Sequence, residues 1–296
     1  MTTRIGLATC TAIDPEFGDD PTVVGALRDR GVEADRPVWD DPSVDWSSYD
    51  LVVIRSTWDY TPRRHEFVAW ATSLGDRVQN APEVIAWNSD KAYLADLAAT
   101  GLAVVPTTYV APGDDLPSLA GEVVVKPTVS AGAIDTGRFG PATHGLALDL
   151  VARIHATGRT AMVQPYLSSV DTVGETAVVC LDGEPSHVLR KRAVLRPDEV
   201  APVREGDIGA AEAMYEDDLV VASTATDAEL AFASDVLAWV TARFGAAPLY
   251  ARVDMVEGDG GAPVLMELEA VEPYLYLAES PGSLRHLVDT ILRRVT

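Results

Sequence analysis

Four charged residues alternate with apolar ones near the C-terminal end of the chain. The stretch "ARVDMV" carries Arg252 and Asp254, and "LMELEA" carries Glu267 and Glu269. Side chains two residues apart on a strand point to the same face, so each pair is expected to share a face. The intervening "EGDGGA" is typical of a hairpin turn, which would bring three carboxylates and one guanidinium together. Such carboxylates repel one another unless cations neutralise them, and their hard oxygen atoms suit Mg²⁺.

Lysine is rare in this chain, with Lys91, Lys126 and Lys191 as its only three among 23 basic residues. Lys126 ends an apolar strand and precedes "TVSAGAIDTGRFG", whose small residues let backbone N–H groups approach phosphate oxygens. Glycine loops are common, and this one is not a Walker P-loop because no Gly-Lys-Ser/Thr follows. The stretch "VQPYL" (163–167) is typical of a hinge whose extended backbone can bind an adenine edge, although a strand and turn explain it equally well.

The elements that would position these residues fall into three predicted units: 1–85, 86–167 and 168–296. In the first, "RIGLATC" and "YDLVVIRST" read as strands and "PTVVGALRDRG" as a helix, which predicts a small α/β unit. "RSTWDY" follows the second strand, where open α/β sheets bind ligands. Its Arg55, Trp58 and Tyr60 belong either to a capped turn or to a loop that faces the substrate.

The second and third units are predicted to be α+β. We expect a helix capped by Asn88 or Ser89 and ending at Gly101. The other expected elements are strands at 103–110, 121–129 and 160–167, a helix near 146–157, two strands within 174–195, a mobile polar stretch 196–224, and helices 226–243 and 283–294.

The composition limits the partners. A formal net charge of −22 argues against binding to nucleic acid, whose backbone is also negative. No signal peptide or membrane span is visible, and Cys10 and Cys180 lack metal-ligand spacing, so we expect a cytoplasmic protein. A small-molecule substrate is the expected partner, and a homodimer remains open.

The order of these features resembles the ATP-grasp superfamily over about residues 86–275. A helix lysine, a strand lysine, a small-residue loop, a hinge and strand-borne carboxylates follow one another as in that family. The resemblance implies a small N-terminal α/β domain and two α+β subdomains that hold ATP and Mg²⁺ between them. It implies phosphate contacts from Lys91, Lys126, Lys191 and the loop Ser130, Ala131, Gly132 to Thr136, adenine contacts from Gln164, Pro165, Tyr166 and Leu167, and a ribose contact from Glu175, with Asp171 as the alternative.

The resemblance also implies roles for the four hairpin residues. Asp254, Glu267 and Glu269 match the family's Mg²⁺ ligands, although the last ligand is usually Asn, so Glu269 adds a negative charge. Arg252 matches the arginine that stabilises the acyl-transfer transition state in members similar to D-alanine–D-alanine ligase. A structural salt-bridge network is the competing interpretation of these residues.

Four stretches, "RSTWDY", "KPTVSAGAIDT", "SHVLRKR" and "RVDMV…LMELEAVEPYLYL", are most similar to one branch of the superfamily. That branch contains the D-cycloserine-forming O-ureidoserine cyclo-ligase. The resemblance implies an enzyme that phosphorylates a carboxylate and transfers the acyl group to an amine, giving an amide or a ring. The alternatives are another amide-forming ligase and an ATP-binding regulatory protein without turnover.

Overall fold

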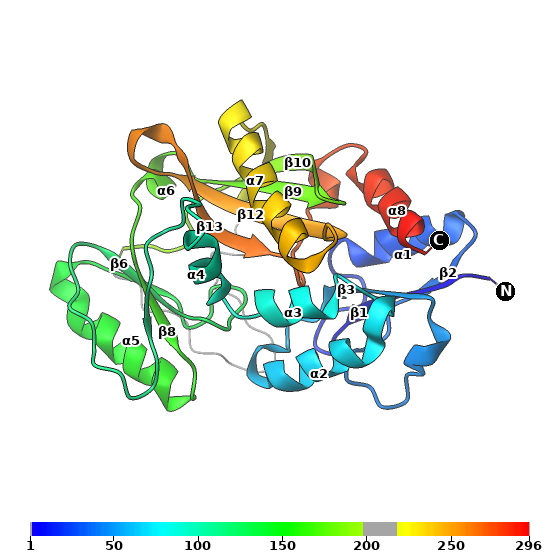
Figure 1. Ribbon diagram of the computed structural model, residues 1–296, viewed down its shortest axis with the longest axis horizontal. Coiled ribbons are helices and arrows are strands. Elements are labelled where there is room, and N and C mark those ends of the chain that lie inside the picture. The colour runs from blue at the N-terminus through cyan, green and yellow to red at the C-terminus, as the bar shows by residue number, and fades with distance from the viewer. Residues whose placement is uncertain (1, 198–217, 296) are drawn as a thin grey trace.

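The computed structural model describes residues 2–197 and 218–295, and their strands form three sheets (Figure 1). The N-terminal sheet is parallel, with strand order β2-β1-β3-β4. Its strand β3 is buried at every residue, as expected for an apolar run at the centre of a parallel sheet. The α/β prediction for this unit is confirmed. Its elements are β1 (Arg4–Thr9), α1 (Asp20–Asp29), β2 (Glu33–Asp35), β3 (Leu51–Ser56), α2 (Arg64–Leu74) and β4 (Val78–Gln79).

The central sheet is antiparallel, with strand order β5-β8-β6-β7, and α5 covers one face. Val125, Phe139, Val151 and Ile154 belong to the apolar core between sheet and helix. The elements are β5 (Thr108–Val110), β6 (Val123–Pro127), β7 (Gly137–Phe139), α5 (His144–Ala156) and β8 (Ala161–Pro165). The strand predicted over 103–110 is therefore regular only at its end.

The helix predicted to run from Asn88 or Ser89 to Gly101 is wrong in its bounds. The chain instead forms α3 (Pro82–Asn88) and α4 (Tyr93–Ala98), with a break between them. Asn88 is not a cap, because its side-chain amide donates to the carbonyl of Leu268 (2.8 Å) and accepts from the N–H of Ala270 (2.6 Å). This long-range pairing holds α3 against the C-terminal sheet.

The C-terminal sheet is antiparallel, with strand order β11-β10-β9-β12-β13. Helix α7 begins with a capping box between Thr226 and Glu229, as its sequence favours. Of the polar stretch predicted over 196–224, residues 198–217 lie outside the described part, whereas β11 is a regular strand. The elements are α6 (Ser169–Thr172), β9 (Glu175–Leu181), β10 (Glu184–Lys191), β11 (Val220–Ser223), α7 (Asp227–Phe244), β12 (Tyr250–Glu257), β13 (Pro263–Glu269) and α8 (Ser283–Arg294).

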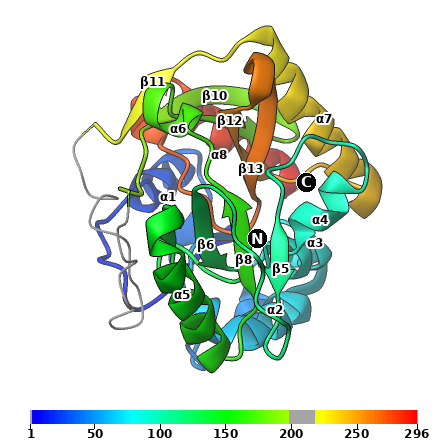
Figure 2. The same ribbon diagram turned by 90° about the vertical axis from the view of Figure 1, so that its left-hand side faces the viewer.

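The C-terminal helix α8 crosses back to the N-terminal unit and lies beside α1 (Figure 1). Leu287 and Ile291 of α8 share one apolar core with Leu27 of α1 and with Val179 of β9. The N-terminal sheet and the C-terminal sheet are therefore packed together. The central sheet and α5 share a separate apolar core, and Figure 2 shows α5 beside β6 and β8. No helix in the described part of the chain is long and apolar enough to span a membrane.

Candidate active site

A cavity of about 990 Å³ opens where the three units meet. Its wall includes Trp58 from the N-terminal unit, Lys126 and Gln164 from the central sheet, and Arg252 and Glu267 from the C-terminal sheet. Residues that lie far apart in the sequence therefore contribute to one wall. A cavity of this size suits a nucleotide together with a small molecule.

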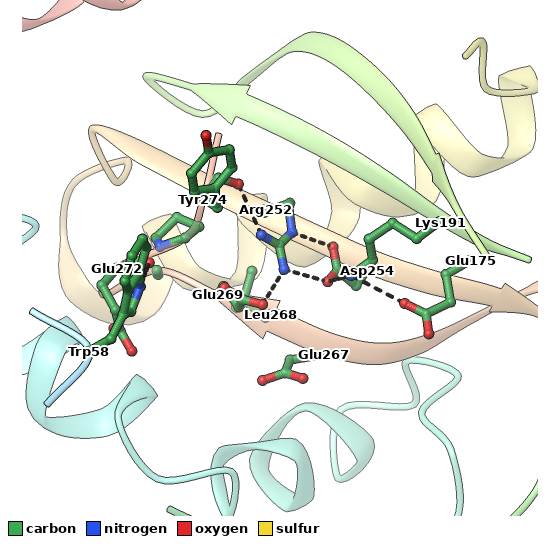
Figure 3. A network of polar contacts seen from close by, with 12 residues as sticks. Trp58, Glu175, Lys191, Arg252, Asp254, Glu267, Leu268, Glu269, Glu272 and Tyr274 are labelled. Atoms are coloured by element: carbon green, nitrogen blue, oxygen red, sulfur yellow. Dashed lines mark hydrogen bonds and ion pairs between the residues drawn. The ribbon is translucent and has the colours of Figure 1, made fainter. Parts of the chain in front are cut away.

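The hairpin of β12 and β13 brings its four charged residues together, as predicted. Arg252 pairs with Glu269 across the strands, and Asp254 pairs with Glu267. The Arg252 guanidinium donates from Nε and Nη2 to the two oxygens of Asp254 (2.8 and 2.9 Å) and also forms an ion pair with Glu269 (Figure 3). Its Nη1 donates to the carbonyl of Tyr274 (2.9 Å), so the guanidinium is fixed on several sides.

A second cation extends this network from the neighbouring strand pair. Lys191 Nζ lies 2.7 Å from Oδ2 of Asp254 and 3.2 Å from Oε2 of Glu175, which joins the two acids (Figure 3). Burial alone would raise the pKa of Asp254, but Arg252 and Lys191 hold that pKa well below its usual range. Asp254 is therefore ionised and, at 1% exposed, depends on these two cations.

The other two lysines face the cavity from different elements and differ in their pairing. Lys91 Nζ lies 3.2 Å from Oε1 of Glu267 and donates to the carbonyl of Ser130 (2.7 Å). Lys126 has no hydrogen bond or ion pair with any side chain in the described residues, although it also lines the cavity. Burial lowers the pKa of Lys126, and the nearby Glu267 partly offsets this decrease. A bound anion would therefore stabilise the charged form of Lys126.

The expected Mg²⁺ ligands are not arranged as a metal site in this structure. In the described residues, no group of three acidic, histidine or cysteine side chains is placed to hold a metal ion. The reason is that Asp254, Glu267 and Glu269 each point toward an ammonium or guanidinium partner. Burial, against the opposing pull of Arg252, raises the pKa of Glu269 to about 6. Carboxylate oxygens are the type of ligand that Mg²⁺ prefers. Each of the three carboxylates is already neutralised by a cationic side chain, so a positive charge is favoured beside it.

The predicted adenine-binding segment includes the end of β8, and its hydrogen bonds limit which backbone groups could contact a base. The N–H of Tyr166 donates to the carbonyl of Glu122 (2.8 Å), whereas the N–H of Leu167 donates to no backbone carbonyl in the described residues. Gln164 turns its side-chain amide to the hydroxyl of Thr107 (2.8 Å).

An arginine behind the segment holds it in place. Arg138 lies 3.5 Å from the ring centre of Tyr166 and binds both Glu122 and Asp171 with two nitrogens each. Tyr166 also donates to Asp171 (2.7 Å). Because Asp171 is committed to these partners, Glu175, which lines the cavity, is the better placed of the two predicted ribose acids.

The structure separates the three predicted substrate residues of the N-terminal loop. Trp58 and Tyr60 line the cavity, but Arg55 does not. Arg55 is 3% exposed, and its guanidinium binds Asp20 (3.1 Å) and the carbonyl of Pro273 (3.2 Å). The prediction that Arg55 contacts the substrate directly is therefore corrected: its side chain is used to attach the segment after β13.

Sequence reasoning missed the most unusual acid of the cavity, Glu272. Burial, and then the nearby Glu269 carboxylate, raise the pKa of Glu272 to about 8, while a hydrogen bond from Tyr60 opposes the rise. The indole N–H of Trp58 donates to the backbone carbonyl of Glu272 (3.0 Å; Figure 3). Glu272 lies beyond the end of β13, so the strand alternation that indicated Glu267 and Glu269 gave no signal for it.

Comparisons with known proteins agree with this architecture. The family model of the N-terminal domain of D-cycloserine synthetase DcsG matches residues 5–82. The cycloserine biosynthesis protein DcsG of Streptomyces lavendulae is 37% identical over 294 residues, which is 95% of each chain. The crystal structure of D-cycloserine synthetase DcsG has a TM-score of 0.87 at 34% identity and covers 99% of this chain and 100% of that one.

A more distant structure shares the fold. D-alanine–D-alanine ligase from Bacillus anthracis, complexed with ATP, has a TM-score of 0.70 at 14% identity and covers 99% of this chain and 97% of that one. The match to the Streptomyces lavendulae protein covers 95% of both chains, and this coverage establishes the family. The chain, with its ATP-grasp fold, belongs to the family of D-cycloserine synthetase DcsG.

Proposed function

We propose that this enzyme is an ATP-dependent ligase that activates the carboxylate of a small amino-acid-like substrate as an acyl phosphate and transfers the acyl group to an amine. The family makes cyclisation of O-ureidoserine the first reaction to test, in which the attacking nitrogen is that of the ureido group in the same molecule. Other amide-forming ligations come next. One observation carries the proposal: in the described residues Lys126 faces the cavity without an ion pair, beside three bases that are each paired with an acid.

ATP would lie with its phosphates at the lysines and its base at the end of β8. Lys126 and Lys91 supply ammonium groups to the phosphates, and the loop Ser130, Ala131 and Gly132 lies over them. The left-handed backbone of Gly132 (φ 63°) allows the tight turn that this loop needs. The N–H of Leu167 is left for the adenine edge, and Glu175 is placed for the ribose.

The charges of the cavity support bound Mg²⁺. In its charged network four bases face four acids: Lys91, Lys126, Lys191 and Arg252 against Glu175, Asp254, Glu267 and Glu269. Further acids line the same cavity, so a fully ionised triphosphate would add to an excess of negative charge unless divalent cations arrived with it. Asp254, Glu267 and Glu269 would hold Mg²⁺, which neutralises phosphate charge and polarises the γ-phosphoryl group.

The chemistry then depends on the position of Arg252. An oxygen of the substrate carboxylate attacks the γ-phosphorus, ADP leaves, and the amine nitrogen attacks the acyl carbon before phosphate departs. The negative charge that develops on the acyl oxygen needs a donor that is already in place. Arg252 meets this requirement, because Asp254, Glu269 and the carbonyl of Tyr274 fix its guanidinium before any ligand binds.

Isotope transfer tests the proposal directly. The enzyme is incubated with ATP, Mg²⁺ and O-ureidoserine labelled with oxygen-18 in its carboxylate, and the released phosphate is analysed by mass spectrometry. We expect one labelled oxygen in the phosphate, and no ADP from the matching carboxamide. Turnover without label in the phosphate would exclude carboxylate activation. ATP binding without ADP release, over a panel of amino acids, would favour the regulatory alternative.

A further inference from the structure

In the described residues, one partly buried acid of the cavity, Glu272, has neither an ion pair nor a backbone N–H bound to its carboxyl. The nearby hydroxyl of Tyr60 lowers the pKa of this carboxyl. The acids of the neighbouring network differ, because each lies within ion-pair distance of a lysine or arginine. These paired acids are Glu175, Asp254, Glu267 and Glu269.

The remaining acids on the cavity wall also lack an ion pair in the described residues, but their surroundings differ. Asp14, Asp218 and Glu279 are exposed, so water screens their charge. Asp19 is buried but accepts from the N–H of Leu277 at both oxygens (3.2 Å each). Glu272 is partly buried and, in the described residues, has no positive partner.

The position of Glu272 is fixed from both sides. Trp58 holds its carbonyl, and Arg55 holds the carbonyl of the following Pro273 (3.2 Å). The buried Tyr60 lies near the carboxyl itself. A segment whose backbone is held by two residues of another domain is ordered at a cost in conformational entropy, which indicates that its position matters.

The surroundings of Glu272 suit a small cation. Phe17, Trp58 and Tyr274 lie around this end of the cavity with ring centres 6.2 to 6.3 Å apart. Aromatic faces attract ammonium groups. An ammonium group beside Glu272 would also favour the ionised form of its carboxyl and add a direct charge interaction. Figure 3 shows Glu272 with Trp58 at the end of the network remote from Lys191 and Glu175.

From this arrangement we infer that Glu272 binds the α-ammonium group of the amino-acid substrate and selects substrates that carry one. The inference rests on the proposed function for the identity of the substrate. Three residues of chain separate Glu272 from Glu269, the partner of Arg252, so their Cα atoms lie within ~10 Å of each other. A small amino acid can therefore reach Glu272 with its ammonium while its carboxylate lies near Arg252.

Binding of two matched ligands tests the inference. Isothermal titration calorimetry, with a non-hydrolysable ATP analogue present, compares O-ureidoserine with 3-(ureidooxy)propanoate, which lacks only the amino group. The wild type should bind the amino acid about ten to a hundred times more tightly, as expected for a charge-assisted hydrogen bond. Glu272→Gln, which keeps the side-chain volume and a partner for Tyr60, should bind both ligands with similar affinity.

Two further variants complete the experiment. Tyr60→Phe removes only the hydroxyl that orients the carboxyl and should reduce the discrimination without abolishing it. Glu184→Gln, the same substitution at an exposed site on β10, should leave the discrimination at its wild-type value.

The outcomes separate this inference from the proposed function. If Glu272→Gln still prefers the amino acid as strongly as the wild type, or if the wild type does not discriminate, the inference is wrong even when ADP is released. If Glu272→Gln loses the discrimination but the wild type releases no ADP with O-ureidoserine, the ammonium site stands and the proposed reaction fails.

Discussion

Replacing Lys126 with Met should weaken ATP binding without weakening the fold. The Lys126 ammonium has no partner among the described residues, and burial lowers its pKa. A lysine whose pKa is lower in the folded state than in the unfolded state is costly to keep charged. This cost to stability is full below the pKa of the folded state and disappears as the pH rises from that pKa to the pKa of the unfolded state. The free energy of unfolding of Lys126→Met, measured without nucleotide near neutral pH, should therefore equal or exceed that of the wild type.

The same substitution should be harmful to nucleotide affinity. A charged hydrogen bond to phosphate is worth about 1.5–3 kcal/mol, which corresponds to a roughly tenfold to hundredfold rise in the Kd for ATP. Calorimetric titration with ATP and Mg²⁺ measures this rise, and urea denaturation measures the stability.

Lys191→Met is the matched control, because it removes the same group from a paired position. Lys191 lies 2.7 Å from Asp254 and 3.2 Å from Glu175, and these acids raise its pKa against the effect of burial. Its stabilising contribution is present below the ordinary lysine pKa and is lost only as the pH rises through the higher folded value. Removing one partner of a buried pair costs about 3–5 kcal/mol. If Lys126→Met binds ATP normally, or destabilises the fold as much as Lys191→Met, the reasoning about unpaired charge is refuted.

Three more predictions concern the hairpin and the segment that follows it. Glu267→Gln should fold and yet release no ADP, because a proposed Mg²⁺ ligand is lost; full activity in a coupled ADP assay with Mg²⁺ would contradict that role. Arg252→Met should lower kcat by about a hundredfold or more through loss of the oxyanion donor, while calorimetry still detects ATP binding; an unchanged kcat would remove Arg252 from the mechanism. The pKa of Glu272 is raised from 4.5 to about 8, so the folded state binds its proton more tightly and stability should fall as the pH rises through this window. Glu272→Gln should flatten that fall in urea denaturation series at several pH values, and an identical slope would show that Glu272 is not shielded.

The sequence by itself determined the hairpin and its charged face. Strand alternation is a local property with a period of two residues, so the shared face of Arg252 and Asp254, that of Glu267 and Glu269, and the short connection "EGDGGA" were predictable. The register was not, because an irregularity between Asp254 and Met255 sets the pairing of Arg252 with Glu269 and of Asp254 with Glu267. The α/β character of the N-terminal unit and helix α7 were also predictable from local signals. The order of lysines, loop and carboxylates was also enough to indicate the ATP-grasp fold.

Only the tertiary structure decided which polar groups are left for a ligand. Arg55 lies in β3 and Trp58 three residues later in the segment that follows, yet the first is buried against Asp20 and the second faces the cavity. Whether a charged group is already paired depends on partners far away in the chain, as between Arg55 and the carbonyl of Pro273, and no local period records such contacts. Within residues 2–197 and 218–295, Lys126 and Glu272 form no ion pair for the same reason, because burial and pairing are set by the packing of all three sheets.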